Sequence, residues 1–253
     1  MTENFSLLSE ALRIRKGSVV ALVGGGGKTG AMLTVSRELA EMGWRVVAST
    51  TTRVGQSVAA SMPVLTMRVD TPPERLASAV SESGRVFLCA GRSGDGKLLG
   101  VDPWALTAIR DSGLADVVIV EADGARQMPL KAPGGHEPII PEEVDLVSPV
   151  AGLDALGLTI EPGSVHRPEL VARLTGPGRI TPQTIADVLM ADEGGMKGIP
   201  VTASVSPILN KLDSVTLDIA VQTAAAVLAR RPDRVARVLI TSLRDREYLL
   251  VRP

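Results

Sequence analysis

The sequence predicts an α/β fold with three layers, in which helices cover both faces of a mostly parallel sheet. Apolar runs rich in β-branched residues, such as Val19–Val23 and Val117–Val120, alternate with segments of helical periodicity. A glycine-rich turn joins the first run to a helix and a second strand follows, which is typical of a right-handed βαβ unit. We expect a single domain, 1–253, in which a small lobe is inserted at about 125–200, where glycine and proline concentrate.

The composition favours a protein that works on small molecules or protein partners. Lys and Arg number 27 against 28 Asp and Glu, and aromatic residues make up 2% of the chain. A nucleic-acid partner is therefore not expected, because neither a basic field nor stacking platforms are indicated. No apolar run reaches the roughly 18–20 residues of a membrane span and no signal-peptide pattern begins the chain, so we expect a cytoplasmic protein without a membrane partner.

The first functional motif is the run SVVALVGGGGKTG, Ser18–Gly30. A strand, a glycine-rich loop and a helix N-terminus gather backbone N–H groups around one point, where a phosphate fits. In such P-loop NTPase-like proteins the lysine contacts the terminal phosphates and the following hydroxyl binds Mg²⁺. The predicted phosphate-binding residues are Gly24, Gly25, Gly26, Gly27, Lys28 and Thr29.

The loop departs from the usual spacing G-x-x-x-x-G-K-[ST], because Leu22 occupies the position of the first glycine. It is better written G-x-x-G-K-T, a short form that also occurs in ligases that activate carboxylates with ATP. The motif therefore predicts a nucleoside triphosphate and leaves the base open.

The remaining elements follow from periodicity and turn residues. A helix at Thr29–Met42 ends before Gly43, and the strand Trp44–Ser49 delivers Thr50, Thr51 and Thr52 to its carboxyl end, where ligands gather in such sheets. At least one of these threonines is predicted to touch Mg²⁺ or the γ-phosphate, with strand packing or helix capping as the alternative. Further strands are expected at Pro63–Val69, Arg85–Ala90, Val144–Val150, Val205–Asn210, Arg234–Ile240 and, at the sheet edge, Tyr248–Val251; helices at Phe5–Ile14, Pro72–Ser83, Asp102–Asp111, Pro168–Leu174, Thr181–Met190 and Ser214–Arg230; and a hairpin or active-site loop at Gly91–Gly100.

A second functional motif, DVVIVEADG, spans Asp116–Gly124. Four apolar residues predict a buried strand that ends in Glu121 and Asp123. In P-loop proteins a carboxylate at this place holds Mg²⁺ directly or through water. Thr29, Glu121 and Asp123 are therefore the predicted metal ligands, and Lys28, Glu121 and Asp123 the predicted catalytic residues.

The loop Ala125–Pro141 is rich in proline, glycine and charged residues. Loops of this kind carry function more often than linkers do, although an ordinary surface loop is the alternative. With the neighbouring pair that precedes the helix at Pro168, it provides the predicted substrate or partner residues, which are Arg126, Lys131, His136, Glu137, His166 and Arg167.

A third motif, Asn210-Lys211-Leu212-Asp213, follows a strand and precedes a helix. N-K-x-D is the guanine-reading element of GTP-binding proteins, in which the aspartate accepts two hydrogen bonds that adenine does not offer. The motif favours GTP over ATP, and Asn210, Lys211 and Asp213 are the predicted base-reading residues.

Taken with VALVGGGGKT, the threonine triplet, VEADGAR, LKAPGGHEPIIP and VHRPEL, the chain resembles the YqeC-like accessory proteins of selenium-dependent molybdenum hydroxylases from Val19 to Asp213. The resemblance implies a P-loop NTPase-like protein linked to the maturation of a molybdenum hydroxylase or its cofactor. Gly30 departs from the family, which usually has a second threonine there. Nothing in the residues themselves indicates selenium.

The sequence thus predicts a protein that binds GTP or ATP with Mg²⁺, hydrolyses it slowly and assists a molybdenum hydroxylase. Two alternatives remain open at this point. One is an ATP-dependent enzyme that activates or phosphorylates a small substrate, and the other is a non-catalytic, chaperone-like binding module that retains the loop.

Overall fold

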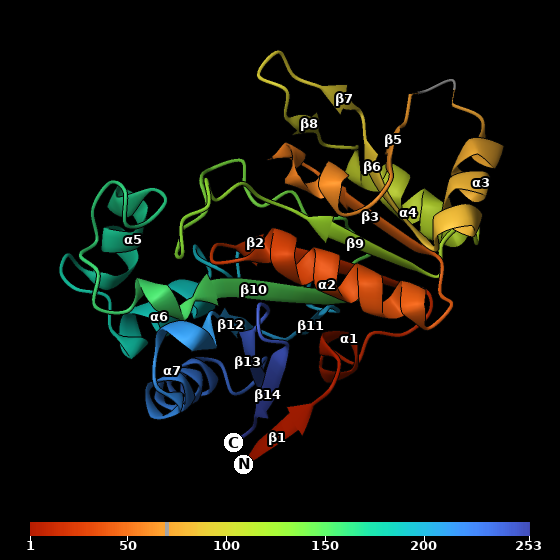
Figure 1. Cartoon of the computed structure of the whole chain (residues 1–253). Helices are drawn as coiled ribbons and strands as arrows, with labels where there is room; N and C mark the ends of the chain where they lie inside the picture. The colour runs from red at the N-terminus through yellow and green to blue at the C-terminus, as the bar shows by residue number, and fades with distance from the viewer. Residues whose placement is uncertain (69–70) are drawn as a thin grey trace.

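A mostly parallel sheet runs through the molecule in this computed structural model, which describes residues 1–68 and 71–253 (Figure 1). In the described part of the chain the sheet has eleven strands, in the order β1-β14-β13-β12-β10-β2-β9-β3-β6-β5, with β11 beside β10. Its strands are β1 (Thr2–Phe5), β2 (Ser18–Gly24), β3 (Val46–Thr50), β5 (Val64–Thr66), β6 (Arg85–Cys89), β9 (Val117–Glu121), β10 (Leu146–Gly152), β11 (Ser204–Val205), β12 (Ile208–Asn210), β13 (Val238–Ser242) and β14 (Glu247–Val251).

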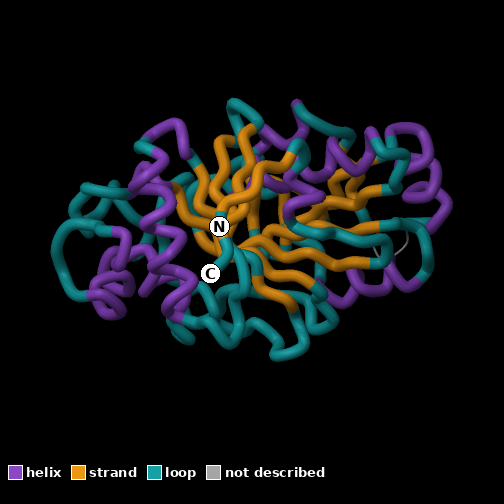
Figure 2. Tube along the Cα trace, turned by 90° about the horizontal axis from the view of Figure 1, so that it is seen from below, coloured by secondary structure: helices purple, strands orange, loops and turns teal. Residues whose placement is uncertain are grey.

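Helices cover both faces of this sheet, and Figure 2 shows the strands between them. One face packs against α1 and α2, whereas the opposite face packs against α3 and α4 at one end and against α6 and α7 at the other. The predicted three-layer α/β architecture is confirmed. The helices are α1 (Leu8–Ala11), α2 (Lys28–Glu41), α3 (Pro73–Ser83), α4 (Pro103–Asp111), α5 (Pro168–Thr175), α6 (Pro182–Met190) and α7 (Leu217–Arg230), and three 3₁₀ turns are η1 (Gln56–Ala60), η2 (Leu153–Ala155) and η3 (Leu212–Ser214).

The layers follow from the side-chain pattern of the central strands. In β2 and β9 apolar residues occupy successive positions, so both faces of each strand are hydrophobic and need cover. Val20 and Ile119 pack in the cluster that includes α2, while Ala21 and Val120 pack in the cluster that includes α3 and α4. Because β2 pairs with both β9 and β10 in parallel, the carboxyl ends of three strands meet around the glycine loop.

Two helices begin at the caps that the sequence predicts, and the predicted hairpin is present. Asp102 caps α4 by accepting a hydrogen bond from the Trp104 N–H at 3.3 Å, and the hydroxyl of Thr181 caps α6 by accepting one from the Thr184 N–H at 3.2 Å. The segment Gly91–Gly100 forms the hairpin of β7 (Gly91–Arg92) and β8 (Leu98–Leu99), which joins β4 (Arg53–Val54) in a second, three-stranded sheet.

The two ends of the chain correct the sequence-based predictions. The predicted helix Phe5–Ile14 is wrong in extent, since Thr2–Phe5 forms strand β1 and only Leu8–Ala11 is helical. The predicted edge position of β14 is also wrong, because β1 pairs antiparallel with it and becomes the edge. Backbone groups of β14 are satisfied by a strand from the opposite end of the chain, which no local pattern reveals.

Strand bounds differ in two further places. The predicted strand Val205–Asn210 is interrupted at Pro207, which has no N–H to donate to the ladder, and so divides into β11 and β12. The predicted start of a strand at Arg234 is wrong, because residues 231–235 form a turn closed by the Val235 N–H donating to the Arg231 carbonyl. The end of the strand predicted at Pro63–Val69 lies outside the described residues.

The middle segment 125–200 contributes to the main sheet through β10, which lies next to β2. Its remaining residues form a long loop and the helices α5 and α6, and α6 packs beside α7 (Figure 1). An inserted lobe at 125–200 stays a prediction.

Candidate functional site

The glycine loop lies between β2 and α2 and needs glycine for both conformation and space. Gly26 has φ +75°, in the left-handed region, and a Cβ there would collide with the backbone nitrogen of Gly152. Gly24 has φ +94°, and a Cβ would collide with the Val150 carbonyl oxygen. The loop is therefore packed against β10 by direct backbone contact.

Three of the four glycine amides already have acceptors inside the protein. The Gly24 N–H donates to both carboxylate oxygens of Asp123, at 3.0 and 3.1 Å, the Gly25 N–H to the Val150 carbonyl at 2.9 Å, and the Gly26 N–H to the Met128 carbonyl at 2.9 Å. The first N–H groups of a helix have no acceptor within it. In this conformation the amides available for phosphate are therefore those at Gly27 and in the first turn of α2, not the whole predicted set.

Lys28 is buried at the start of α2, with 4% of its side chain exposed. Its Nζ donates to the Gly24 carbonyl at 2.6 Å and lies 3.2 Å from Asp123 Oδ1. The lysine thus closes the glycine loop onto the end of β9. An ammonium group held at this place is positioned to meet phosphates above the loop.

A chain of alternating charges leads away from Lys28. Asp123 Oδ2 lies 3.0 Å from Lys131 Nζ, which also donates to Glu137 Oε2 at 2.7 Å, and Glu137 in turn accepts from Arg167 at 2.5 Å. The Lys131 side chain is fully buried and also donates to the Gly124 carbonyl at 2.5 Å. All three protons of its ammonium group are used, so Lys131 braces the turn after β9 rather than facing a substrate.

Glu121 differs from Asp123 in its surroundings. It is buried, and its Oε1 has no hydrogen-bond partner among the described residues. Burial raises the pKa of Glu121, against the opposing effects of the Lys28 charge and a hydrogen bond with Thr29. A buried carboxylate oxygen with an open lone pair beside a threonine hydroxyl fits the oxygen ligands of Mg²⁺, which takes one or two carboxylates together with phosphates and water.

The three threonines at the end of β3, Thr50–Thr52, mainly make hydrogen bonds to the backbone. The hydroxyl of Thr50 donates to the Glu121 carbonyl at 3.0 Å and accepts from the Thr52 N–H at 3.1 Å. The hydroxyl of Thr51 donates to the Ile139 carbonyl at 2.8 Å. Thr50 and Thr51 therefore tie β3 to the strand end that carries Glu121 and to the long loop.

On the other side of the glycine loop, Asn210 joins three elements. Its Nδ2 donates to the Gly26 carbonyl at 2.8 Å, and its Oδ1 accepts from the Thr241 hydroxyl at 3.0 Å. Asn210 is buried at the end of β12. The amide thus fixes the loop after β12 relative to both the phosphate loop and β13.

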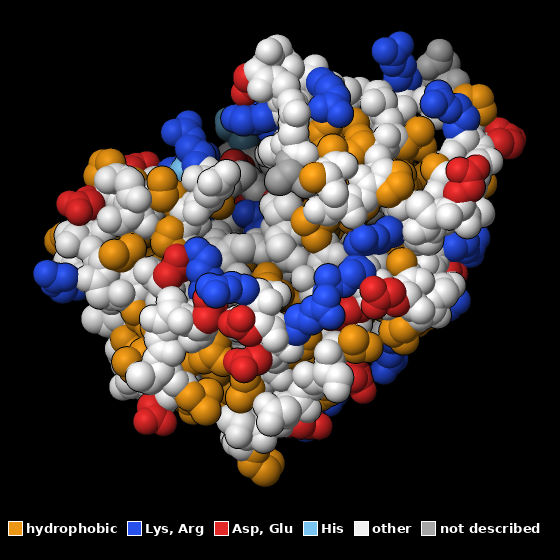
Figure 3. Space-filling model, in the orientation of Figure 1, with side chains coloured by type: hydrophobic (Ala, Val, Ile, Leu, Met, Phe, Trp, Pro, Cys, Tyr) orange, Lys and Arg blue, Asp and Glu red, His pale blue; other side chains and the backbone are white. Residues whose placement is uncertain are grey.

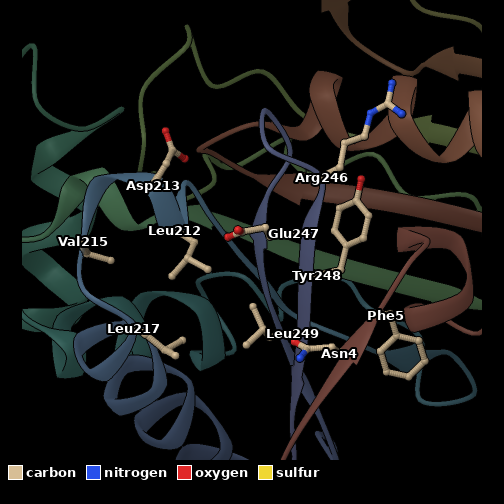
Figure 4. A pocket seen from close by; sticks show the side chains of 10 residues that line it. All are labelled: Asn4, Phe5, Leu212, Asp213, Val215, Leu217, Arg246, Glu247, Tyr248 and Leu249. Carbon is tan, nitrogen blue, oxygen red and sulfur yellow. The ribbon is translucent and has the colours of Figure 1, made fainter.

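Lys211 and Asp213 are held by different partners. Lys211 has φ +67°, and its Nζ donates to Asp154 Oδ2 at 2.5 Å. Asp213 accepts from the Ser242 hydroxyl at 3.2 Å, which orients its carboxylate. A cavity of about 580 Å³ opens beside Asp213, and Figure 4 shows this residue at one end, Phe5 at the other and β14 between them.

Sequence patterns missed Met128 and Asp154. Met128 acts through its carbonyl, and Asp154 approaches Lys211 because β10 and β12 are neighbours in the sheet. A backbone acceptor leaves no mark in a motif, and an ion pair across two strands requires the sheet order to be known. Ser242 ends β13 and reaches Asp213 through its hydroxyl.

The remaining predicted substrate residues lie at the edge of this site. His166 pairs with Lys131 in an isolated parallel bridge, and Arg167 contacts Glu137. Arg126 and His136 are exposed. The structure therefore brings His166 and Arg167 to the charge chain and leaves His136 on the surface of the long loop.

Glu137 provides a test of the charge chain. Burial opposes its ionisation, but hydrogen bonds from Arg167 and Lys131 outweigh burial and lower its pKa from 4.5 to about 2. A depressed carboxyl pKa stabilises the fold above pH 4.5, and this contribution is lost as the pH falls towards 2. We expect Glu137→Gln to lower the free energy of unfolding at pH 7 by about 1–2 kcal/mol, after allowance for partial exposure.

Urea unfolding of both proteins between pH 7 and pH 2.5 measures this contribution. The gap between wild type and Glu137→Gln should narrow over that range. Glu142→Gln, at an exposed carboxylate on the same loop, is the matched control. A gap that is the same at every pH would contradict the role of Glu137.

A glycine-rich loop joins a central strand to a helix, a buried lysine closes this loop, and an acidic strand end flanks it. This arrangement is typical of P-loop proteins. The chain has a three-layer, P-loop NTPase-like α/β fold. In the described residues no helix is long and apolar enough to cross a membrane.

Comparison with known proteins identifies the family. The family model described as YqeC protein matches residues 20–169. The YqeC protein of Escherichia coli (strain K12) is 32% identical over 194 residues, which cover 74% of this chain and 73% of that protein. The chain belongs to the YqeC family.

A solved structure is also similar in part. FtsY from Mycoplasma mycoides aligns with a TM-score of 0.43 and 12% identity over 96% of this chain. This chain spans 65% of the length of that FtsY chain.

Proposed function

We propose that this protein binds GTP with Mg²⁺ and uses it in the maturation of a molybdenum hydroxylase or its cofactor. The arrangement of the N-K-L-D segment is the observation that supports GTP as the bound nucleotide. Asn210 holds the segment to the phosphate loop through the Gly26 carbonyl, and Ser242 orients Asp213. A carboxylate in this place accepts from the N1–H and the N2 amine of guanine, whereas adenine presents an acceptor at N1.

In this proposal, different residues bind the phosphates and the metal ion. Lys28 and the amides at the start of α2 bind the β- and γ-phosphates. Thr29 and Glu121 hold Mg²⁺, which would neutralise phosphate charge there. Asp123 holds Lys28 and the loop in position instead of binding the metal directly, because it already faces two ammonium groups. Hydrolysis would rest on positioning and charge stabilisation, and we expect it to be slow without a partner.

The maturation role rests on the family. Membership in the YqeC family and the resemblance of VEADGAR, LKAPGGHEPIIP and VHRPEL support it. The residues of the long loop and of the segment before α5 lie beside the phosphate loop, so a partner or substrate bound there would sense the nucleotide. The Gly26–Met128 hydrogen bond is one direct connection between the two.

Nucleotide preference tests the proposal. Equilibrium binding of fluorescent GTP and ATP analogues with Mg²⁺ should show GTP bound at least about tenfold more tightly, the effect of one well-made hydrogen bond to a charged group. EDTA should weaken GTP binding, because Mg²⁺ held by Thr29 and Glu121 would neutralise phosphate charge. Tighter binding of ATP would contradict the guanine assignment and favour an ATP-dependent enzyme.

A further inference from the structure

A group of basic residues borders the phosphate loop on the side away from Asn210. His166 is fixed by its backbone, since its N–H donates to the Leu130 carbonyl at 2.9 Å and it pairs with Lys131. Arg167 follows it at the start of α5, and Arg126 lies in the turn after β9. Two segments, the turn after β9 and the residues before α5, thus bring an imidazole and two guanidinium groups near one another.

Basic side chains surround His166. Burial, and to a smaller extent the positive charges of Arg167, Lys131 and Arg126, lower the pKa of its ring. Lys131 and Arg167 already share Glu137, and Asp123 and Glu169 also act on Arg167. Arg126 is exposed, so its guanidinium is the group most open to an added anion.

The backbone of the turn is held in a costly conformation. Arg126 and Gln127 have φ +48° and +63°, both in the left-handed region. Each such residue costs on the order of 1–3 kcal/mol and persists where the surrounding structure holds it, often at ligand sites. Here the carbonyl of the next residue, Met128, accepts a hydrogen bond from the Gly26 amide. The turn that carries Arg126 is therefore attached directly to the phosphate loop.

The surface is hollowed in this region. In Figure 3 a recess lies between the part of the surface that contains α5 and the part that contains the β7–β8 hairpin. Lys, Arg and His side chains lie along its edge. The charge chain runs from Arg167 through Glu137, Lys131 and Asp123 to Lys28 at the phosphate loop.

We propose that Arg126, His166 and Arg167 form a subsite for an anionic group, a phosphate or a carboxylate, of a second substrate bound next to the nucleotide. The subsite deepens the proposed function and rests on it. Arg126 and Arg167 would donate to the anion through their guanidinium groups, and His166 would donate through one ring nitrogen. Lys131 stays out of contact and holds the turn in place.

The chain offers a direct readout, because it contains two histidines. Ring ¹H–¹³C spectra of the full-length protein, saturated with Mg²⁺ and a non-hydrolysable GTP analogue, should contain two sets of imidazole signals. The variant His136→Gln identifies which set belongs to His166. Inorganic phosphate and acetate are then titrated separately. We expect one of them to shift the His166 signals in a saturable way, which names the anionic group, while the His136 signals stay in place.

A pair of variants makes the test specific. Arg126→Ala should weaken the apparent affinity for that anion about tenfold or more, the effect of a lost hydrogen bond to a charged group. Arg173→Ala, at an exposed arginine on α5, should leave it unchanged. The subsite is wrong if neither anion moves the His166 signals, if the His136 signals move equally, or if Arg126→Ala binds as well as wild type.

Failure of the subsite and failure of the proposed function can be told apart. GTP binding is measured on the same samples, and the control Arg173→Ala should bind GTP as tightly as wild type. If GTP does not bind, the titration is repeated with Lys28→Ala, in which the phosphate loop is weakened as an alternative anion site. A specific His166 response there would keep the anion subsite and contradict the nucleotide function.

Discussion

Replacing Lys28 by alanine is expected to weaken Mg²⁺–GTP binding at least about 100-fold. The ammonium group sits over the glycine loop and would make charge-assisted hydrogen bonds to the phosphates, each of which contributes roughly 1.5–3 kcal/mol. The fold should survive, because Asp123 keeps Lys131 and the Gly24 N–H as partners. Isothermal titration with GTP measures the affinity, and circular dichroism with urea unfolding checks the fold.

Lys16→Ala is the control for Lys28→Ala. Its side chain is 57% exposed, pairs with Asp116 at 3.6 Å and lies over the Trp44 ring, 5.4 Å from its centroid. Because Lys16 has no part in the phosphate loop, GTP affinity should not change. An unchanged GTP affinity of Lys28→Ala would contradict the proposal that the loop binds phosphate. A molybdenum hydroxylase that matures normally in cells carrying Lys28→Ala would instead favour the non-catalytic, chaperone-like alternative.

Replacing Asp213 by asparagine is expected to change the base that is read. The hydrogen bond from the guanine amine to the carboxylate is lost, because the asparagine amide presents a donor to that amine and the two donors oppose each other. GTP affinity should therefore fall by about 100-fold or more. Xanthine carries a carbonyl where guanine carries that amine. The asparagine amide can donate to it, so xanthosine triphosphate should bind Asp213→Asn more tightly than GTP does.

Competition experiments with GTP, ATP and xanthosine triphosphate measure this reversal. Asp218→Asn, in the first turn of α7, is the matched control and should keep the preference for GTP. Asp213→Asn that retains the wild-type order of nucleotides would show that Asp213 does not read the base, whatever the fate of the phosphate site.

Some of this site was predictable because it is local in sequence. The run Ser18–Thr29 contains strand, loop and helix start in continuous order, and the run Asp116–Asp123 contains a strand and its acidic end. Backbone conformation and hydrophobic periodicity decide such segments over a few residues. The fold class follows from the same patterns repeated along the chain.

Other parts needed the folded chain. Lys131 reads as a charged loop residue, yet its side chain is fully buried between Asp123 and Glu137. Glu121 and Asp123 read as equivalent acids, yet one faces two lysines and the other has an oxygen without a partner among the described residues. The distinction depends on which segments the sheet order brings together.

Local patterns in the sequence are enough to predict an α/β protein with a phosphate-type loop, an acidic strand end and a guanine-type motif. Short-range backbone preferences and apolar periodicity carry that information. The folded chain is needed to see that the Met128 carbonyl accepts from the Gly26 amide, that Lys131 is internal and that Arg167 reaches Glu137. These contacts depend on strand pairing and on the removal of water from charged groups, which no short stretch of sequence specifies.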